Sequence, residues 1–216
     1  IHMSQSNLHD AEQQQFVDPN GSYKFNYTPP DDLGGMKYVV AQLCTDVSGS
    51  TFDFTANLKT LAQNVVRGLQ LSPVADMVLL RHVEFSSDFK EIHGFVPVTS
   101  LKPDNFKEPV ANGGTRLYDV TLEGLTVLQN YSQTLVDQDF EAVPVLFVIT
   151  DGEDSSLDDR VLKQIAAKKH EMLVSEQFSD VITVLLGIGS PSNNRLKKYM
   201  EDFKKSGNFN HLEYVT

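Results

Sequence analysis

The sequence has one cysteine, no tryptophan and no long uninterrupted apolar segment among its 216 residues. A single cysteine, Cys44, excludes an intramolecular disulfide. Its position within an apolar run predicts a small core side chain rather than a nucleophile. No stretch approaches the roughly 18 consecutive apolar residues of a membrane-spanning helix. We therefore expect a chain that folds around an ordinary hydrophobic core and has no membrane span.

Basic residues are also scarce, since 18 Lys and Arg face 29 Asp and Glu and leave a formal net charge of −11. Nucleic acids and anionic membranes are bound through basic surfaces, so this balance argues against both as partners. It favours divalent cations. Most of the negative charge is expected to serve solubility alone.

The first residues carry neither a basic segment nor an apolar segment of the kind that begins a secretory signal. If Met3 is the native start, the sequence predicts a cytoplasmic protein. Residues 1–35 are polar, rich in turn residues and without periodicity, and they predict an N-terminal arm that precedes a globular domain over residues 36–216.

Three aromatic residues of the arm alternate along the chain: Tyr23, Phe25 and Tyr27. Alternation with a period of two is typical of a strand that has one buried face. We therefore expect part of the arm to form a short added strand, packed on the sheet edge or against a helix.

Apolar β-rich runs alternate with helical patterns along the rest of the chain. Strands are expected near residues 37–45, 77–85, 143–149, 181–188 and 209–215, with 92–98 as an antiparallel edge strand. Helices are expected near residues 58–69, after 115, and over 157–176 and 194–205. This order predicts an α/β fold with an open, mostly parallel, doubly wound sheet of the Rossmann-like kind.

The run from Lys37 to Ser50 is the stretch around which the chain is organised. An apolar segment leads directly into a polar loop, in which Asp46, Ser48 and Ser50 supply a carboxylate and two hydroxyls. These are hard oxygen ligands, which suit Mg²⁺, Mn²⁺ or Ca²⁺ far better than zinc. Three such side chains cannot fill an octahedral shell, so the pattern requires further ligands elsewhere in the chain.

Two later loops can supply them. Thr115 follows Asn112-Gly113-Gly114, and Asp151 directly follows the apolar run Val143–Ile149. In an open parallel sheet, ligands gather at the carboxyl ends of the strands. Asp46 and Asp151 are both expected at such ends and can therefore converge. Thr45 and Thr150, which precede the two aspartates, are candidates for supporting hydrogen bonds.

At these residues the chain resembles the von Willebrand factor type A (vWA) domain family, over roughly Lys37–Thr216. The family's metal-ion-dependent adhesion site (MIDAS) is written Asp-x-Ser-x-Ser, then a distant Thr and a distant Asp. The matching residues here are Asp46, Ser48, Ser50, Thr115 and Asp151. The resemblance implies a bound divalent cation, most often Mg²⁺, with an open position that a carboxylate from an Asp or Glu of a protein partner fills.

The resemblance carries two further implications. Intracellular members serve as adaptors or assembly factors, some of them with chaperone-like ATPases, whereas extracellular members bind matrix or surface proteins. Members also tend to end in a helix after the last strand, which moves on ligand binding in integrin-type domains. This sequence ends near its last predicted strand, so that switch is not expected unless the arm replaces the helix or the natural chain continues beyond Thr216.

Other interpretations of the same residues remain open. Ser and Asp in loops are also common helix caps. A metal-dependent hydrolase is the alternative to a binding module, and it would need a general base such as Glu153 or Asp154. In the binding interpretation those two residues, with Ser155, form an acidic rim, and no catalytic residue is assigned. The histidines His82, His93 and His170 lack zinc spacing, and Gly187–Ser190 lacks the spacing of a phosphate loop.

Overall fold

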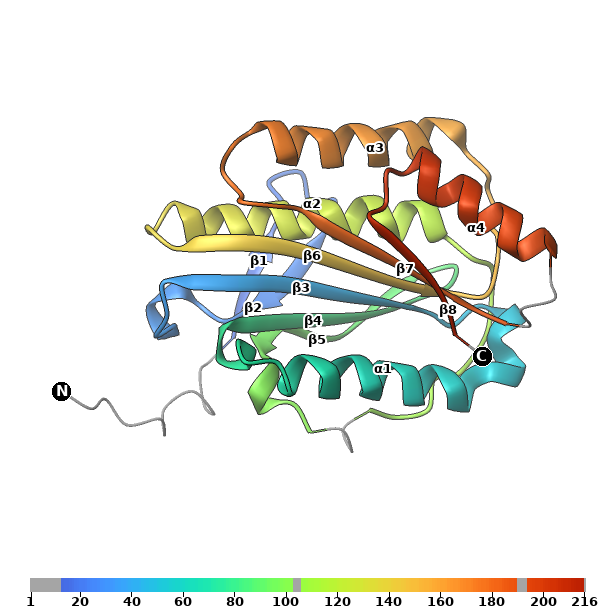
Figure 1. Cartoon of the computed structure of the whole chain (residues 1–216), viewed down its shortest axis with the longest axis horizontal. Helices are drawn as coiled ribbons and strands as arrows, with labels where there is room; N and C mark the ends of the chain where they lie inside the picture. The colour runs from blue at the N-terminus through green and yellow to red at the C-terminus, as the bar shows by residue number, and fades with distance from the viewer. Residues whose placement is uncertain (1–12, 103–105, 190–193, 216) are drawn as a thin grey trace.

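The computed structural model describes residues 13–102, 106–189 and 194–215 (Figure 1). The strands are β1 (Gln14–Val17), β2 (Lys24–Tyr27), β3 (Lys37–Asp46), β4 (Val78–Phe85), β5 (Phe89–Pro97), β6 (Glu141–Thr150), β7 (Ile182–Ile188) and β8 (His211–Val215). The α-helices are α1 (Thr55–Gln70), α2 (Leu117–Val136), α3 (Asp159–Val174) and α4 (Asn194–Ser206). Among these helices, none has the length and apolar character needed to cross a membrane.

The strands form one eight-stranded sheet in the order β1-β2-β5-β4-β3-β6-β7-β8. Strands β4, β3, β6, β7 and β8 run parallel to one another, and β5 is antiparallel to β4. The predicted α/β class and mostly parallel sheet are therefore confirmed. The sheet extends beyond the predicted edge strand, because β2 pairs in parallel with β5 and β1 pairs antiparallel with β2.

Helices cover both faces of the sheet and enclose two cores. Helices α2, α3 and α4 lie on one face and α1 lies on the other (Figure 1). The larger core joins the sheet to α2, α3 and α4, and the smaller joins it to α1 and Phe106. The central strand β3 is buried along nearly its whole length, as the continuous apolar run predicts for a strand covered on both faces.

The N-terminal hairpin docks on the sheet edge and on α2. Phe25 is 1% exposed and lies between the rings of Phe16 and Phe95, at centroid distances of 4.9 and 5.8 Å. The Tyr131 hydroxyl of α2 donates to the Thr28 carbonyl at 2.7 Å. The expected added strand is thus present at the β5 edge, and the chain ends at the opposite edge of the sheet, after β8.

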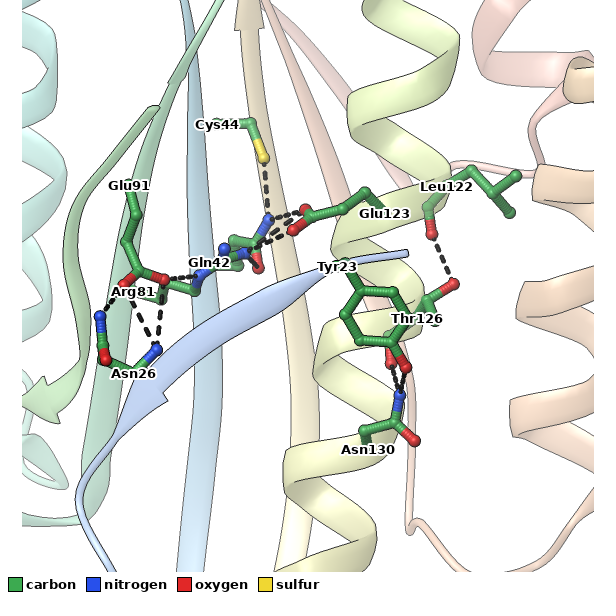
Figure 2. A network of polar contacts seen from close by, with 10 residues as sticks. All are labelled: Tyr23, Asn26, Gln42, Cys44, Arg81, Glu91, Leu122, Glu123, Thr126 and Asn130. Atoms are coloured by element: carbon green, nitrogen blue, oxygen red, sulfur yellow. Dashed lines mark hydrogen bonds and ion pairs between the residues drawn. The ribbon is translucent and has the colours of Figure 1, made fainter. Parts of the chain in front are cut away.

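A buried ion network joins this hairpin to the sheet and α2 (Figure 2). Arg81 is 3% exposed and bonds Glu91 at 2.7 Å and Glu123 at 3.1 Å. Glu91 in turn accepts from the backbone and side chain of Asn26 on β2. Gln42 of β3 completes the group by accepting from Arg81 at 2.8 Å. One guanidinium therefore holds two partly buried carboxylates, and one of them anchors the hairpin.

The packing of Phe25 yields a stability prediction. Phe25→Ala should lower the free energy of unfolding by about 3–5 kcal/mol, because it leaves a cavity between the hairpin and the sheet. Phe52→Ala is the matched control: Phe52 is 71% exposed and its loss should change stability by less than about 0.5 kcal/mol. Urea unfolding of both variants is the measurement. Equal urea midpoints for Phe25→Ala and Phe52→Ala would mean that the hairpin is not part of the cooperatively unfolding core.

Candidate metal centre

The central strands bring Asp46 and the Thr150-Asp151 pair together. Strands β3 and β6 are adjacent and parallel, with Thr45 opposite Ile149, so both end at the same edge of the sheet. The Thr150 hydroxyl donates to Asp46 Oδ2 at 2.5 Å. Thr150 thus has the supporting role that its position before Asp151 suggested.

The loop after β3 adds the two serines. The Ser48 backbone N–H donates to Asp46 Oδ1 at 2.9 Å, which turns the chain back toward the strand end. Ser48 Oγ and Ser50 Oγ lie 3.1 Å apart, and Ser50 Oγ donates to Asp151 Oδ1 at 2.9 Å. Four of the five predicted residues therefore form one connected group of oxygen atoms, from strand ends about a hundred residues apart in sequence.

The loop that carries Thr115 is held beside this group by its backbone. The Gly49 N–H donates to the Gly113 carbonyl at 3.0 Å. Thr115 is 6% exposed, and its N–H donates to Ser155 Oγ at 2.8 Å. Within the described residues, the Thr115 hydroxyl makes no hydrogen bond to the other four side chains, so the structure places Thr115 next to the group without joining it. Gly113 has φ +73°, a backbone conformation that other residues rarely adopt, and a Cβ there would meet Ser87 Oγ at 2.6 Å. Any residue larger than glycine would therefore be strained at this position.

Burial dominates the electrostatics of the two aspartates. Burial raises the pKa of Asp46 to about 6, although the hydrogen bonds from Thr150 and Ser48 partly oppose this. Burial also raises the pKa of Asp151, against the hydrogen bond from Ser50. Both shifts mean that the carboxylates lack a compensating positive charge. A cation bound beside them would supply that charge.

The donor set fits a hard cation. It consists only of carboxylate and hydroxyl oxygens, the ligands that Mg²⁺, Mn²⁺ and Ca²⁺ prefer. Within residues 13–102, 106–189 and 194–215, no three His, Cys, Asp or Glu side chains gather into a group that could hold a metal ion. The two carboxylates at the strand ends depend on hydroxyls to complete the group.

The predicted acidic rim is wrong for Asp154. Asp154 is 2% exposed, and its Oδ2 accepts from the Tyr118 N–H in the first turn of α2 at 2.8 Å. Its Oδ1 accepts from the Leu157 N–H at 3.0 Å. Ser155 bonds the backbone of Thr115 in both directions. The Asp154 side chain therefore organises the loops and does not face a partner, whereas Ser155 is exposed.

Glu153 is the remaining rim acid, and it is paired. Arg195, at the start of α4, donates to both Glu153 oxygens at 2.8 and 3.1 Å. This bidentate contact lowers the pKa of Glu153. The 42-residue separation hides the pair from sequence reasoning, and only an arginine near the start of a predicted helix hints at it.

The histidines His82 and His93, which lack zinc spacing in the sequence, lie close together in the structure. They oppose each other across β4 and β5 with ring centroids 6.0 Å apart, at an irregularity in the pairing of the two strands. His82 Nε2 lies 3.0 Å from the Thr45 hydroxyl. Burial lowers the pKa of both rings, that of His82 to about 3, so both are neutral at physiological pH.

Comparison with known proteins places the fold. No protein-family profile matches the chain, and no curated protein matches it in sequence. Solved structures do match. The pilus adhesin SpaC of Lactobacillus rhamnosus GG aligns with TM-score 0.60 and 14% identity, over 85% of this chain and 28% of the adhesin. The ArnB paralog VWA2 of Sulfolobus acidocaldarius aligns with TM-score 0.50 and 14% identity, over 83% of this chain and 42% of its own.

A third match has a metal at the corresponding kind of site. Proximal thread matrix protein 1 of the mussel byssus, described with a zinc-occupied MIDAS motif, aligns with TM-score 0.52 and 15% identity, over 84% of this chain and 42% of its own. This chain therefore spans less than half the length of each of these three proteins. At such identities the likeness concerns the fold, and it supports a vWA-like domain.

The buried Asp46 yields a pH prediction for the metal-free protein. The pKa of Asp46 is about 6 in the folded state, above the ordinary value of 3.8, so the folded state favours the protonated carboxyl. The contribution of Asp46 to the free energy of unfolding is therefore greatest below pH 4 and is lost as the pH rises through 6. Asp46→Asn should therefore raise the melting temperature at pH 7 by several degrees, an effect on the order of 2 kcal/mol.

Thermal unfolding in EDTA at pH 7 and pH 4.5 is the measurement. The difference between variant and wild type should be clear at pH 7 and small at pH 4.5. A variant that is less stable than wild type at pH 7 would contradict the account of a carboxylate that lacks its counter-charge.

Proposed function

We propose that the domain is a metal-dependent protein-binding module. In this proposal Asp46, Ser48, Ser50, Thr115 and Asp151 hold one divalent cation, most often Mg²⁺, with Mn²⁺ or Ca²⁺ as substitutes. The cation then binds a carboxylate oxygen of an Asp or Glu that a protein partner presents. The observation that carries the proposal is the connected oxygen group that joins Asp46, Ser48, Ser50 and Asp151.

The charge of the group favours an anionic ligand. Five side chains supply only two carboxylates, and hydrogen bonds from Thr150 and Ser50 already draw on them. A divalent cation here keeps a strong affinity for a further hard, negatively charged oxygen. A carboxylate meets that requirement, whereas the amide of Asn or Gln has the same shape and is a much poorer ligand.

The positions of the acidic residues favour binding over hydrolysis. A hydrolase of this type needs a general base that is free to take a proton from the metal-bound water. Asp154 is buried and accepts backbone hydrogen bonds, and Glu153 forms a bidentate pair with Arg195. Both candidate bases are therefore engaged, and we assign no enzymatic activity.

The matched proteins and the net charge bear on the kind of partner. The matched proteins are described as a pilus adhesin and a byssal thread matrix protein, which supports a role in protein–protein contact. We propose an adaptor or assembly factor, with a chaperone-like ATPase among the candidate partners. The net charge of −11 argues against nucleic acid as a partner.

Metal binding is the first prediction of this proposal. Isothermal titration with Mg²⁺ should give one site per chain. The double substitution Ser48→Ala and Ser50→Ala should weaken the affinity about tenfold or more, because it removes two direct oxygen ligands. Ser72→Ala, in the turn after α1 at the opposite end of the strands, is the control and should bind Mg²⁺ like wild type. Equal affinities for all three proteins would refute the site.

A further inference from the structure

A cavity of about 630 Å³ borders the candidate metal centre. Val47, between two of the metal-loop residues, and Asn112, at the start of the Thr115 loop, both line it. They are joined by a hydrogen bond of 2.9 Å from the Asn112 N–H to the Val47 carbonyl. The cavity extends from there between β4, β5 and the segment from Phe106 to Asn112. Its size is that of a site which takes a side chain together with adjoining backbone.

The lining of the cavity contains both acidic and apolar side chains. Four carboxylates line it, against two ammonium groups: Glu84, Asp88, Glu91 and Glu108 against Lys90 and Lys107. Two of the acids are engaged elsewhere, because Glu91 bonds Arg81 and Glu108 accepts from Thr55. The apolar wall is formed by Ile92, Phe106 and Val110.

Glu84 is a partly buried acid of this lining that lacks a firm partner. Its side chain is only 14% exposed, and its ion-pair contact is Lys90 at 3.6 Å, a lysine that is 75% exposed. Long exposed lysines hold such contacts weakly, since the gain is small and the ordering cost is high. A cation from outside can therefore displace Lys90 and pair with Glu84 in a partly desolvated position.

A second feature points to a ligand in the same place. His82 lines the cavity and is 4% exposed, and its Nδ1 has no hydrogen-bond partner among the described residues. A buried polar atom without a partner carries a desolvation cost. The Phe106 ring lies 5.5 Å from the His82 ring. A polar group that enters the cavity beside Phe106 would supply the hydrogen-bond partner that His82 Nδ1 lacks.

We propose that this cavity receives a lysine or arginine side chain of the same partner segment whose carboxylate binds the metal. The aliphatic stem lies along Ile92, Phe106 and Val110, and the cationic head pairs with Glu84. This inference rests on the proposed function and adds the partner's second anchor. Recognition then requires a carboxylate and a basic residue a few positions apart, so an acidic segment alone binds poorly.

A display library of short random peptides with one fixed Asp tests this inference. The wild-type protein is the bait, in the presence of Mg²⁺, and bound peptides are recovered with EDTA. We expect Lys or Arg to be enriched within a few positions of the Asp. For one recovered peptide, replacing the basic residue by norleucine, which keeps the stem and loses the charge, should raise the Kd about tenfold, equivalent to about 1.4 kcal/mol.

Two variants with opposite expected effects assign the contact. Glu84→Gln should weaken the basic peptide about tenfold and leave the norleucine peptide unchanged. Lys90→Gln should strengthen the basic peptide, because it removes the competing ammonium group. Glu176→Gln, beyond α3 at the other end of the strands, is the matched control and should change neither. Unchanged Mg²⁺ affinity in each variant shows that the fold and the metal centre are intact.

The outcomes separate the two proposals. Peptides that EDTA elutes but that carry no Lys or Arg preference, or that bind Glu84→Gln as they bind wild type, overturn the cavity assignment and leave the metal-dependent module standing. Absence of any EDTA-eluted peptide, with Mg²⁺ binding intact, overturns carboxylate recognition and the cavity assignment together.

Discussion

The carboxylate of Asp46 is the group on which the arrangement of the site depends. It is fully buried, and its two oxygens accept from the Ser48 N–H and the Thr150 hydroxyl. One contact turns the loop after β3, and the other joins that loop to the end of β6. Because the parallel sheet aligns these strand ends, a single buried negative charge fixes the positions of Ser48, Ser50 and Asp151. The same burial leaves the carboxylate without a compensating positive charge, which a bound cation would supply.

Much of the fold could be predicted from local pattern. The apolar run into Asp46, the apolar run into Thr150 and the helical periodicity between them require a parallel sheet whose strand ends meet. The pattern therefore indicated that Asp46 and Asp151 converge, whereas the Thr115 hydroxyl, also expected there, makes no hydrogen bond to the other four side chains in the described residues. The alternation of Tyr23, Phe25 and Tyr27 likewise indicated an added strand, although not that it would continue the sheet beyond β5 as half of a hairpin.

The errors concern contacts that only the tertiary structure creates. Asp154 is an acidic residue in the loop after β6, as expected of a rim residue. In the structure it is buried and caps α2, a helix that begins 37 residues earlier in the sequence at Leu117 (154 − 117). The Arg195 pairing of Glu153 and the meeting of His82 with His93 depend on how α4 is placed and on an irregular strand register. Such features leave no periodic signal, because each depends on a single pair of distant residues.

Substitution of Mn²⁺ for Mg²⁺ tests the central claim most directly, because Mn²⁺ is paramagnetic and broadens nearby amide signals in an NMR spectrum. The account predicts one Mn²⁺ per chain, with the strongest broadening at the amides of Ser48, Gly49, Gly114 and Gly152, where the three loops meet. Competition with Mg²⁺ should restore these signals. Broadening centred on the carboxylates of the neighbouring cavity, at Glu84 and Asp88, or spread evenly over the acidic surface, would contradict the account.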